Sequence, residues 1–383
     1  MAEINFKNII ENDFEESFYK RLRLKIINFL EDNNSASFWD IIRFVEGSDR
    51  RVLRLLSEME KNDEIIYKEK KFSLNVVNKN YDKKNLILDD VYCTSCKSSS
   101  VFLGEEYKKL LRFIKDLYTE KPVPTFLYDQ RPITAETTVR RVAYLKMRGD
   151  FKNKKIAIIG DDDLTSLALG FVNHARKIIV FEIDKRLVDF INKIAKKYGL
   201  DVKAYEYDLT KKIPQEHFHS FDVFITDPTP KPDPFGFFVA IGLHLLKKEP
   251  GKVGYVSFYP SHQFKDVVFQ RILTEYNLIV TDMIPRFTEY DFMQQTYRAT
   301  DLKLLEKYDS GEERLSFYEN LTRFETTKET LFDIALPKIR IQDFQGKATK
   351  KTILDPKNDP AYLAGDKSFV LKAVSEYKDG RNE

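Results

Sequence analysis

The chain has 383 residues, of which 42% are hydrophobic and 32% charged, so its composition is that of a globular protein with room for two or three domains. Its formal net charge of +3 excludes a protein that binds nucleic acid through an overall basic field, and no apolar run long enough to predict a membrane span is present. Two cysteines and the absence of an apolar leader-like segment predict a cytoplasmic protein, and the abundance of Lys and Glu is typical of a thermophile.

Residues 1–80 predict a small domain of three helices and a β-hairpin. The spacing of apolar residues indicates helices at 18–30, at 38–45 and after residue 48, followed by a hairpin at 65–74. This order is typical of a winged helix-turn-helix domain. Two roles stay open: the third helix, with Arg50, Arg51 and Arg54, could bind a nucleic-acid groove, or the domain serves packing or dimerisation. We also expect the protein to be a homodimer.

Residues 81–128 are predicted to form a linker that contains a Cys-x-x-Cys pair, Cys93 and Cys96, and a helix at 105–118. Such a pair provides half of the four ligands that a structural zinc needs. No other cysteine is present, and all five histidines lie beyond residue 170. We therefore predict no metal, with a zinc shared between two subunits as the alternative.

A polar segment precedes the next predicted helix, at 139–147. It contains Asp129, Gln130, Thr134 and Glu136. A segment in this position, just before the first strand of a sheet, often lies on the substrate side, so Gln130 and Glu136 are predicted to bind substrate. The alternative is an ordinary loop in which Thr134 caps the helix.

From residue 154 apolar runs alternate with amphipathic segments. Strands are predicted at 155–159, 178–182, 202–207, 221–226 and 253–258, with helices at 164–174, 185–198 and 235–248. The pattern predicts an α/β class domain at 129–354, a Rossmann-like (methyltransferase-like) doubly wound parallel sheet of the kind used by S-adenosylmethionine enzymes. Residues 355–383 are predicted to be a mobile tail.

Acidic residues follow the predicted strands at the points where they end. The positions are Gly160-Asp161-Asp162-Asp163 after the first strand, Glu182 and Asp208 at the ends of the next two, and Asp227-Pro228 after the fourth. Because ligands bind at the carboxyl ends of parallel strands, these residues predict one site. In it, Glu182 is expected to bind ribose hydroxyls and Asp208 the adenine amino group.

Three carboxylates stand where a nucleotide-binding turn usually has glycines. Gly160 permits the tight turn, but Asp161, Asp162 and Asp163 attract a cation and repel phosphate or carboxylate. The sequence therefore predicts that the ligand is a nucleoside with positive charge.

These motifs carry a family resemblance. Asp227-Pro228 resembles the start of the motif with which amino-group methyltransferases grip an amine, although the usual second proline and aromatic residue are replaced by Thr229 and Pro230. Together with Gly160–Asp163, the segment 131–138 and the predicted winged helix, it resembles the N(4)-bis(aminopropyl)spermidine synthases, the branched-chain polyamine synthases of archaea and thermophiles. The resemblance covers nearly the whole chain, but members of this family often have a fuller cysteine pattern near the linker.

The resemblance implies an enzyme that transfers aminopropyl groups from decarboxylated S-adenosylmethionine, as co-substrate, to the central nitrogen of spermidine, with no tightly bound cofactor. Asp162 and Asp227 are then expected to be catalytic, and Asp161, Asp163 and Pro228 to contact substrate. Two rival hypotheses stay open: a methyltransferase that acts on a nucleic-acid amino group, and a winged-helix regulator that senses a metabolite. The first conflicts with the aspartates in place of glycines, and the second needs a basic recognition surface.

Overall fold

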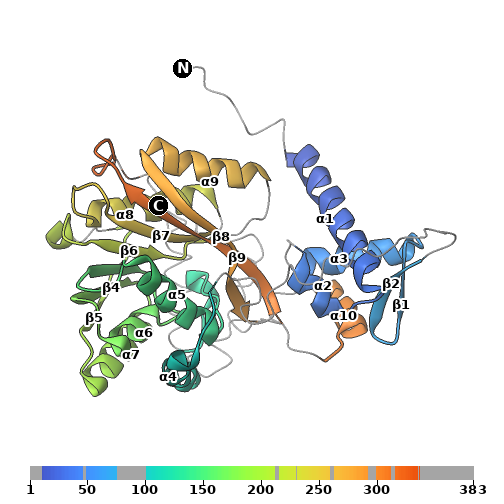
Figure 1. The fold of residues 1–383 in the computed structure, drawn as a ribbon, viewed down its shortest axis with the longest axis horizontal. Coiled ribbons are helices and arrows are strands. Elements are labelled where there is room, and N and C mark those ends of the chain that lie inside the picture. Colours follow the sequence, from blue (N-terminus) through green and yellow to red (C-terminus); the bar gives the residue numbers. More distant parts are fainter. Residues whose placement is uncertain are drawn as a thin grey trace, which may run out of the picture. The chain divides into compact units, whose positions relative to one another are not determined.

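A computed structural model of the chain describes residues 11–45, 49–75, 101–211, 215–229, 231–258, 263–291, 299–311, 315–334 and 336. The chain forms two compact units, the first with the N-terminal helices and hairpin and the second with a large sheet (Figure 1). No helix in these ranges is long and apolar enough to cross a membrane. The Cys93–Cys96 pair and the predicted tail at 355–383 lie outside the described residues.

The first unit has the element order expected for residues 1–80. It contains α1 (Glu11–Asn33), α2 (Phe38–Phe44), α3 (Asp49–Lys61) and an antiparallel hairpin of β1 (Ile65–Lys68) and β2 (Lys71–Leu74). The side chain of Ser37 accepts a hydrogen bond from the backbone amide of Asp40, and Asp40 bonds back, so a capping box begins α2. Trp39 and Phe72 are fully buried in the core of the first unit.

A later part of the chain returns to complete this core. Helix α10 (Ala299–Tyr308) packs against α3, and its Leu305 and Tyr308 join the same apolar cluster (Figure 1). Arg54 of α3 donates two hydrogen bonds, at 2.9 and 2.6 Å, to the buried carboxylate of Asp301. The predicted domain boundaries, which placed residues 299–308 in the catalytic domain, did not include this return of the chain.

The sheet of the second unit is mixed, not fully parallel as expected. Its order is β5-β4-β3-β6-β7-β9-β8. The strands are β3 (Lys155–Ile159), β4 (Lys177–Glu182), β5 (Val202–Glu206), β6 (Val223–Thr226), β7 (Val253–Phe258), β8 (Leu278–Asp291) and β9 (Leu315–Thr326). The five strands from β3 to β7 are parallel, as the βα pattern predicts, whereas β9 runs antiparallel to β7.

Alternating side chains of the parallel strands bury both faces of the sheet. On one face, Ile156 and Ile158 pack in a cluster with α4 (Lys108–Glu120), α5 (Ala135–Arg148), α6 (Thr165–Val172) and α7 (Lys185–Tyr198). On the other face, Ala157 and Ile159 share a cluster with α8 (Pro232–Leu245) and α9 (Gln263–Glu275). The result is three layers with the sheet in the middle.

The sequence predictions are most accurate where apolar runs are continuous. The strands at 155–159 and 253–258 and the helix at 185–198 have the predicted bounds. Helix α8 begins at Pro232 after Lys231, and not at the predicted 235. The strands β8 and β9 and the helices α9 and α10 were not predicted, because their apolar runs are short and interrupted by charged and polar residues.

The pair of Arg54 with Asp301 predicts a stability effect within the first unit. Replacing Arg54 by Ala leaves the buried Asp301 carboxylate without its guanidinium, so we expect the free energy of unfolding to fall by about 1–3 kcal/mol. Arg43→Ala is the matched control, since its partner Asp40 has a side chain that is 44% exposed and such pairs contribute about 1 kcal/mol or less. Urea denaturation of the two variants measures the difference, and equal losses would contradict the assignment.

Candidate active site

The loops that follow β3, β4 and β6 meet at one edge of the sheet. Ile159 lies beside Phe181 of β4 and Thr226 of β6 in the parallel register, so the three strands end at the same level. Thr226 donates a hydrogen bond from Oγ1 to the carbonyl of Ile159 at 3.0 Å and ties two of these ends together. Gly160 follows with a φ of +73°, which favours glycine and turns the chain toward α6. This edge gathers the carboxylate cluster: Asp161, Asp162, Asp163, Glu182 and Asp227.

Asp161 faces the interior. Its side chain is completely buried, and its carboxylate accepts hydrogen bonds from the backbone amide of Ser166 at 3.2 and 3.3 Å. Burial, together with the neighbouring charge of Asp163, raises the pKa of Asp161 well above its usual value. The Asp161 carboxylate thus caps a backbone amide at the start of α6. Its contact with substrate stays a prediction.

Asp163 is also held by the protein, on both its side chain and its backbone. Its carboxylate accepts hydrogen bonds from the amide and hydroxyl of Thr165, at 3.1 and 2.9 Å, and pairs with Arg141. Its carbonyl accepts from the hydroxyls of Tyr118 and Thr138. Burial acts to raise the pKa of Asp163, but the Arg141 guanidinium and the Thr165 bonds hold it below its usual value.

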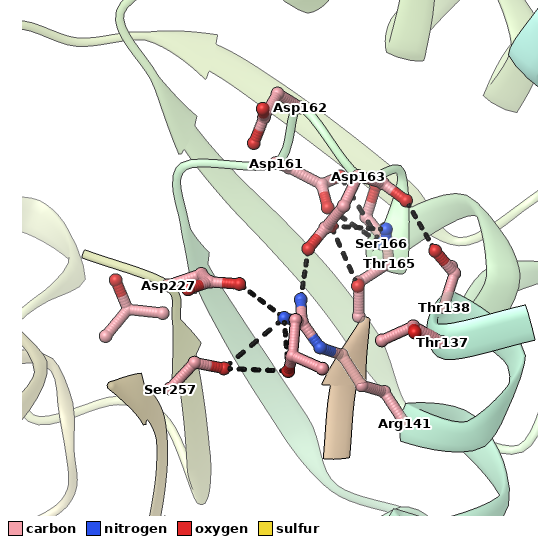
Figure 2. Close-up of polar contacts among 12 residues, drawn as sticks. Thr137, Thr138, Arg141, Asp161, Asp162, Asp163, Thr165, Ser166, Asp227 and Ser257 are labelled. Carbon is pink, nitrogen blue, oxygen red and sulfur yellow. Dashed lines mark hydrogen bonds and ion pairs between the residues drawn. The ribbon is translucent and has the colours of Figure 1, made fainter. Parts of the chain in front are cut away.

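Arg141 of α5 connects two loops of the site. The guanidinium is buried, with 3% of the side chain exposed, and lies between Asp163 and Asp227, to which it donates through separate nitrogens (Figure 2). The sequence reasoning missed this residue. The available signal was the pair Arg140-Arg141 in a helix of largely buried residues, where a guanidinium is retained only if it is paired.

Asp162 differs from its two neighbours. Its backbone carbonyl accepts a hydrogen bond from Lys121 Nζ at 2.7 Å, whereas its carboxylate accepts none from the residues that the structure describes (Figure 2). Burial raises the pKa of Asp162 to about 8, the charges of Asp163, Glu182 and Asp227 act in the same direction, and Lys121 opposes them. A half-buried carboxyl group with a pKa near neutrality is suited to accept a proton or to bind a cation.

Asp227 lies across the same edge, directly after β6. Its side chain is 18% exposed and pairs with Arg141, and the following Pro228 is buried. The structure therefore brings Asp162 and Asp227 to one place, as the positions of the strand ends predict. Asp227 is the more strongly held of the two, because Arg141 engages one of its oxygens.

The two residues predicted to bind the nucleoside have different environments. Glu182 is 4% exposed, and its two oxygens accept hydrogen bonds from the backbone amides of Asp161 and Asp184, at 2.8 and 2.9 Å. Burial raises the pKa of Glu182 to about 7. Asp208 accepts from the amide and hydroxyl of Thr210 within its own turn and pairs with Lys211.

Gln130 and Glu136 do not hydrogen-bond to the carboxylate cluster in the described part of the chain. Gln130 donates to Asp184 at 3.1 Å and accepts from the amide of Thr125, so it braces its own loop against the start of α7. Glu136 pairs with Lys115 of α4 at 2.6 Å and is 39% exposed. Their roles in substrate binding stay predictions.

No group of three or more His, Cys, Asp and Glu side chains among the described residues could hold a metal ion. In the same part of the chain, the cationic groups that hydrogen-bond to residues of the carboxylate cluster are the side chains of Arg141 and Lys121.

Comparison with known proteins identifies a family model and named relatives. A family model described as the branched-chain polyamine synthase A C-terminal domain matches residues 109–344. N(4)-bis(aminopropyl)spermidine synthase from Thermococcus kodakarensis is 35% identical over 229 residues, which are 57% of this chain and 65% of that protein. The protein of the same name from Methanocaldococcus jannaschii is 34% identical over 206 residues, 53% of this chain and 58% of that protein. The matches thus span less than two thirds of these relatives.

The fold is also similar to a solved structure. The branched-chain polyamine synthase from Thermus thermophilus, in complex with N4-aminopropylspermidine and 5′-methylthioadenosine, superposes with a TM-score of 0.69 at 22% sequence identity. The superposition covers 86% of this chain and 92% of that one. This similarity confirms an α/β fold of the same kind.

The environment of Asp162 predicts a carboxyl group that titrates near pH 8. Carbon NMR of labelled aspartate should show this titration, and Asp162→Asn should remove it. Because Lys121 lowers the pKa of Asp162, Lys121→Met should move the titration to higher pH. Lys115→Met is the control, since Lys115 pairs with Glu136 outside the cluster. A titration that survives in Asp162→Asn would contradict the assignment.

Proposed function

The chain belongs to the branched-chain polyamine synthase family, because the family model covers residues 109–344, and on that premise we propose that it is an aminopropyltransferase. The donor is decarboxylated S-adenosylmethionine, a co-substrate and not a resident cofactor, and the acceptor is the central nitrogen of spermidine. The names of the relatives and the complex of the Thermus thermophilus protein support this proposal. The observation that carries it is the free carboxylate of Asp162 among the other acids of the cluster.

The charge of the site supports this choice of donor. Intact S-adenosylmethionine carries a carboxylate beside its ammonium, and a half-buried group of acids repels that carboxylate, whereas the decarboxylated form has lost it and keeps only the ammonium and the sulfonium. Asp162 is the acid of the Gly160–Asp163 turn whose side chain is available to the ammonium. Glu182, at the end of β4, is proposed to bind the ribose hydroxyls, and Asp208 the adenine amino group.

Asp162 and Asp227 are proposed to handle the acceptor amine, with the carbonyl of Pro228 beside it. Polyamines are protonated at neutral pH, so the attacking nitrogen must first lose a proton. Asp162 is the group suited to take it, because its raised pKa lies close to the operating pH. Asp227, which pairs with Arg141, orients the amine.

The reaction then balances without a further reactant. The lone pair of the secondary nitrogen attacks the methylene next to sulfur, the new C–N bond forms, and the C–S bond breaks with its electron pair on sulfur. The leaving group is neutral 5′-methylthioadenosine, the proton removed before the attack is on Asp162, and the positive charge of the sulfonium passes to the new tertiary ammonium. Before a second transfer that nitrogen must again give up its proton; the quaternary ammonium that then forms has no proton to lose, so after the attack the site only stabilises its charge.

The first unit is proposed to be a winged-helix domain with an auxiliary role. In a groove-reading domain of this kind the third helix must be free, but α10 packs against α3 and Asp301 engages Arg54. This arrangement disfavours both the nucleic-acid methyltransferase and the regulator. A homodimer and a cytoplasmic location remain part of the proposal.

The choice of donor can be tested directly. Incubation with spermidine and decarboxylated S-adenosylmethionine should release methylthioadenosine, whereas intact S-adenosylmethionine should release no S-adenosylhomocysteine, because its carboxylate is repelled. Chromatography separates the two nucleosides. Release of S-adenosylhomocysteine in the presence of spermidine or nucleic acid would favour the methyltransferase.

The roles of the two aspartates predict separable effects. Asp162→Asn and Asp227→Asn should each lower kcat by roughly 10²–10⁴-fold, the usual contribution of a group that moves or orients a proton. Donor affinity, measured by calorimetry, should fall more in Asp162→Asn, since Asp162 is the one expected to touch the donor. Asp189→Asn, on the exposed surface of α7, is the control. Wild-type turnover of Asp227→Asn would remove it from the mechanism.

A further inference from the structure

We propose that Arg141 is the positioning residue of this site: it holds Asp163 and Asp227 in place and so leaves Asp162 as the acid that meets the amine. The inference rests on the proposed function, because in that function Asp162 accepts a proton from the acceptor amine. Arg141 itself touches neither donor nor acceptor in this scheme.

The geometry of the guanidinium supports the role. Arg141 comes from α5, and its two terminal nitrogens reach the loops after β3 and β6 separately. Only a planar fork with fixed spacing can do this, since an ammonium is a single point of charge. Arg141 therefore sets the distance between the two loops that carry Asp162 and Asp227 (Figure 2).

Two buried hydroxyls fix the guanidinium from a third side. Nη2 of Arg141 lies 3.4 Å from Ser257 Oγ of β7 and 3.4 Å from Thr288 Oγ1 of β8. These hydroxyls are 3.3 Å apart, and both residues are almost completely buried. Arg141 thus belongs to a helix and hydrogen-bonds both to two loops that follow strands and to side chains on two further strands. Its position therefore cannot shift independently of the sheet.

The charges explain why such an anchor is needed. Asp162 faces the acids Asp163 on its own loop, Glu182 after β4 and Asp227 after β6, and the cation Lys121 after α4. Without Arg141, the buried Asp163 loses the guanidinium that holds its pKa below its usual value, and burial then favours uptake of a proton. Asp163 would then compete with Asp162 for the proton of the amine, and Asp227 would lose the partner that orients it.

Chemical rescue tests the proposal. In Arg141→Ala, kcat should fall by about 10²-fold or more, the usual result of misplacing reacting groups, while the dissociation constant of the donor changes by less than about threefold, a difference below 1 kcal/mol. Guanidinium ion at millimolar concentration should restore kcat at least about tenfold, since it fills the vacated fork, and methylammonium should not. A merely structural arginine would show no such preference for the planar ion.

Further variants keep the proposal falsifiable. Arg141→Lys keeps one charge and is the variant to use if the alanine protein does not fold; it should lose at least about tenfold in kcat because it bridges one loop only. Asp163→Asn should lower kcat in the wild-type background and raise it in Arg141→Lys, where it removes an uncompensated carboxylate. Wild-type kcat in Arg141→Lys, or no guanidinium rescue of folded Arg141→Ala, would overturn the role of Arg141. A wild-type protein that forms no methylthioadenosine would instead overturn the proposed function.

Discussion

The second unit depends on compensating several carboxylates that its fold brings to one edge. Five parallel strands end there, and three of the loops that follow carry buried or half-buried acids. Like charges that lie close together are unfavourable where the side chains are partly shielded from water. The chain compensates them in different ways: Asp161 and Glu182 accept backbone amides, and Asp163 and Asp227 share Arg141. Asp162 is the acid of the cluster whose carboxylate accepts no hydrogen bond from the described residues.

This unequal compensation turns a cluster of acids into a site with distinct roles. A group with a pKa of about 8 is only partly ionised at neutral pH, and a bound cation shifts it toward the charged form. At neutral pH the protein thus avoids the full cost of a further buried charge, and in the proposed function a substrate ammonium is the partner of the ionised form. The same electrostatics that disfavour a phosphate or a carboxylate here favour a sulfonium and a polyamine.

The first unit completes its core with a segment that comes much later in the sequence. Three helices and a hairpin form this core together with Leu305 and Tyr308 of α10. Tyr308 also donates its hydroxyl to Glu60 of α3, and Lys307 pairs with the same carboxylate. These contacts bind the late segment to α3 and so make the stability of the first unit depend on residues that are distant in sequence.

The sequence by itself determined the parallel part of the sheet and the position of the acids. Continuous apolar runs such as Ile156–Ile159 are local signals, and the rule that parallel strands end at one edge then places Glu182 and Asp227 near Gly160–Asp163. It could not determine which way each acid points. The side chain of Asp161 turns inward, whereas that of Asp162 does not. This difference depends on how α6 packs, which the spacing of residues in the sequence does not predict.

Only the tertiary structure revealed the contacts between distant positions. Arg141 lies 22 residues before Asp163 and 86 before Asp227, and Arg54 lies 247 before Asp301. Periodicity reports the neighbours of a residue within its own helix or strand, whereas such pairs form when packing brings separate elements together. The mixed sheet has the same explanation, since β9 enters beside β7 through long-range pairing that its alternating sequence does not specify.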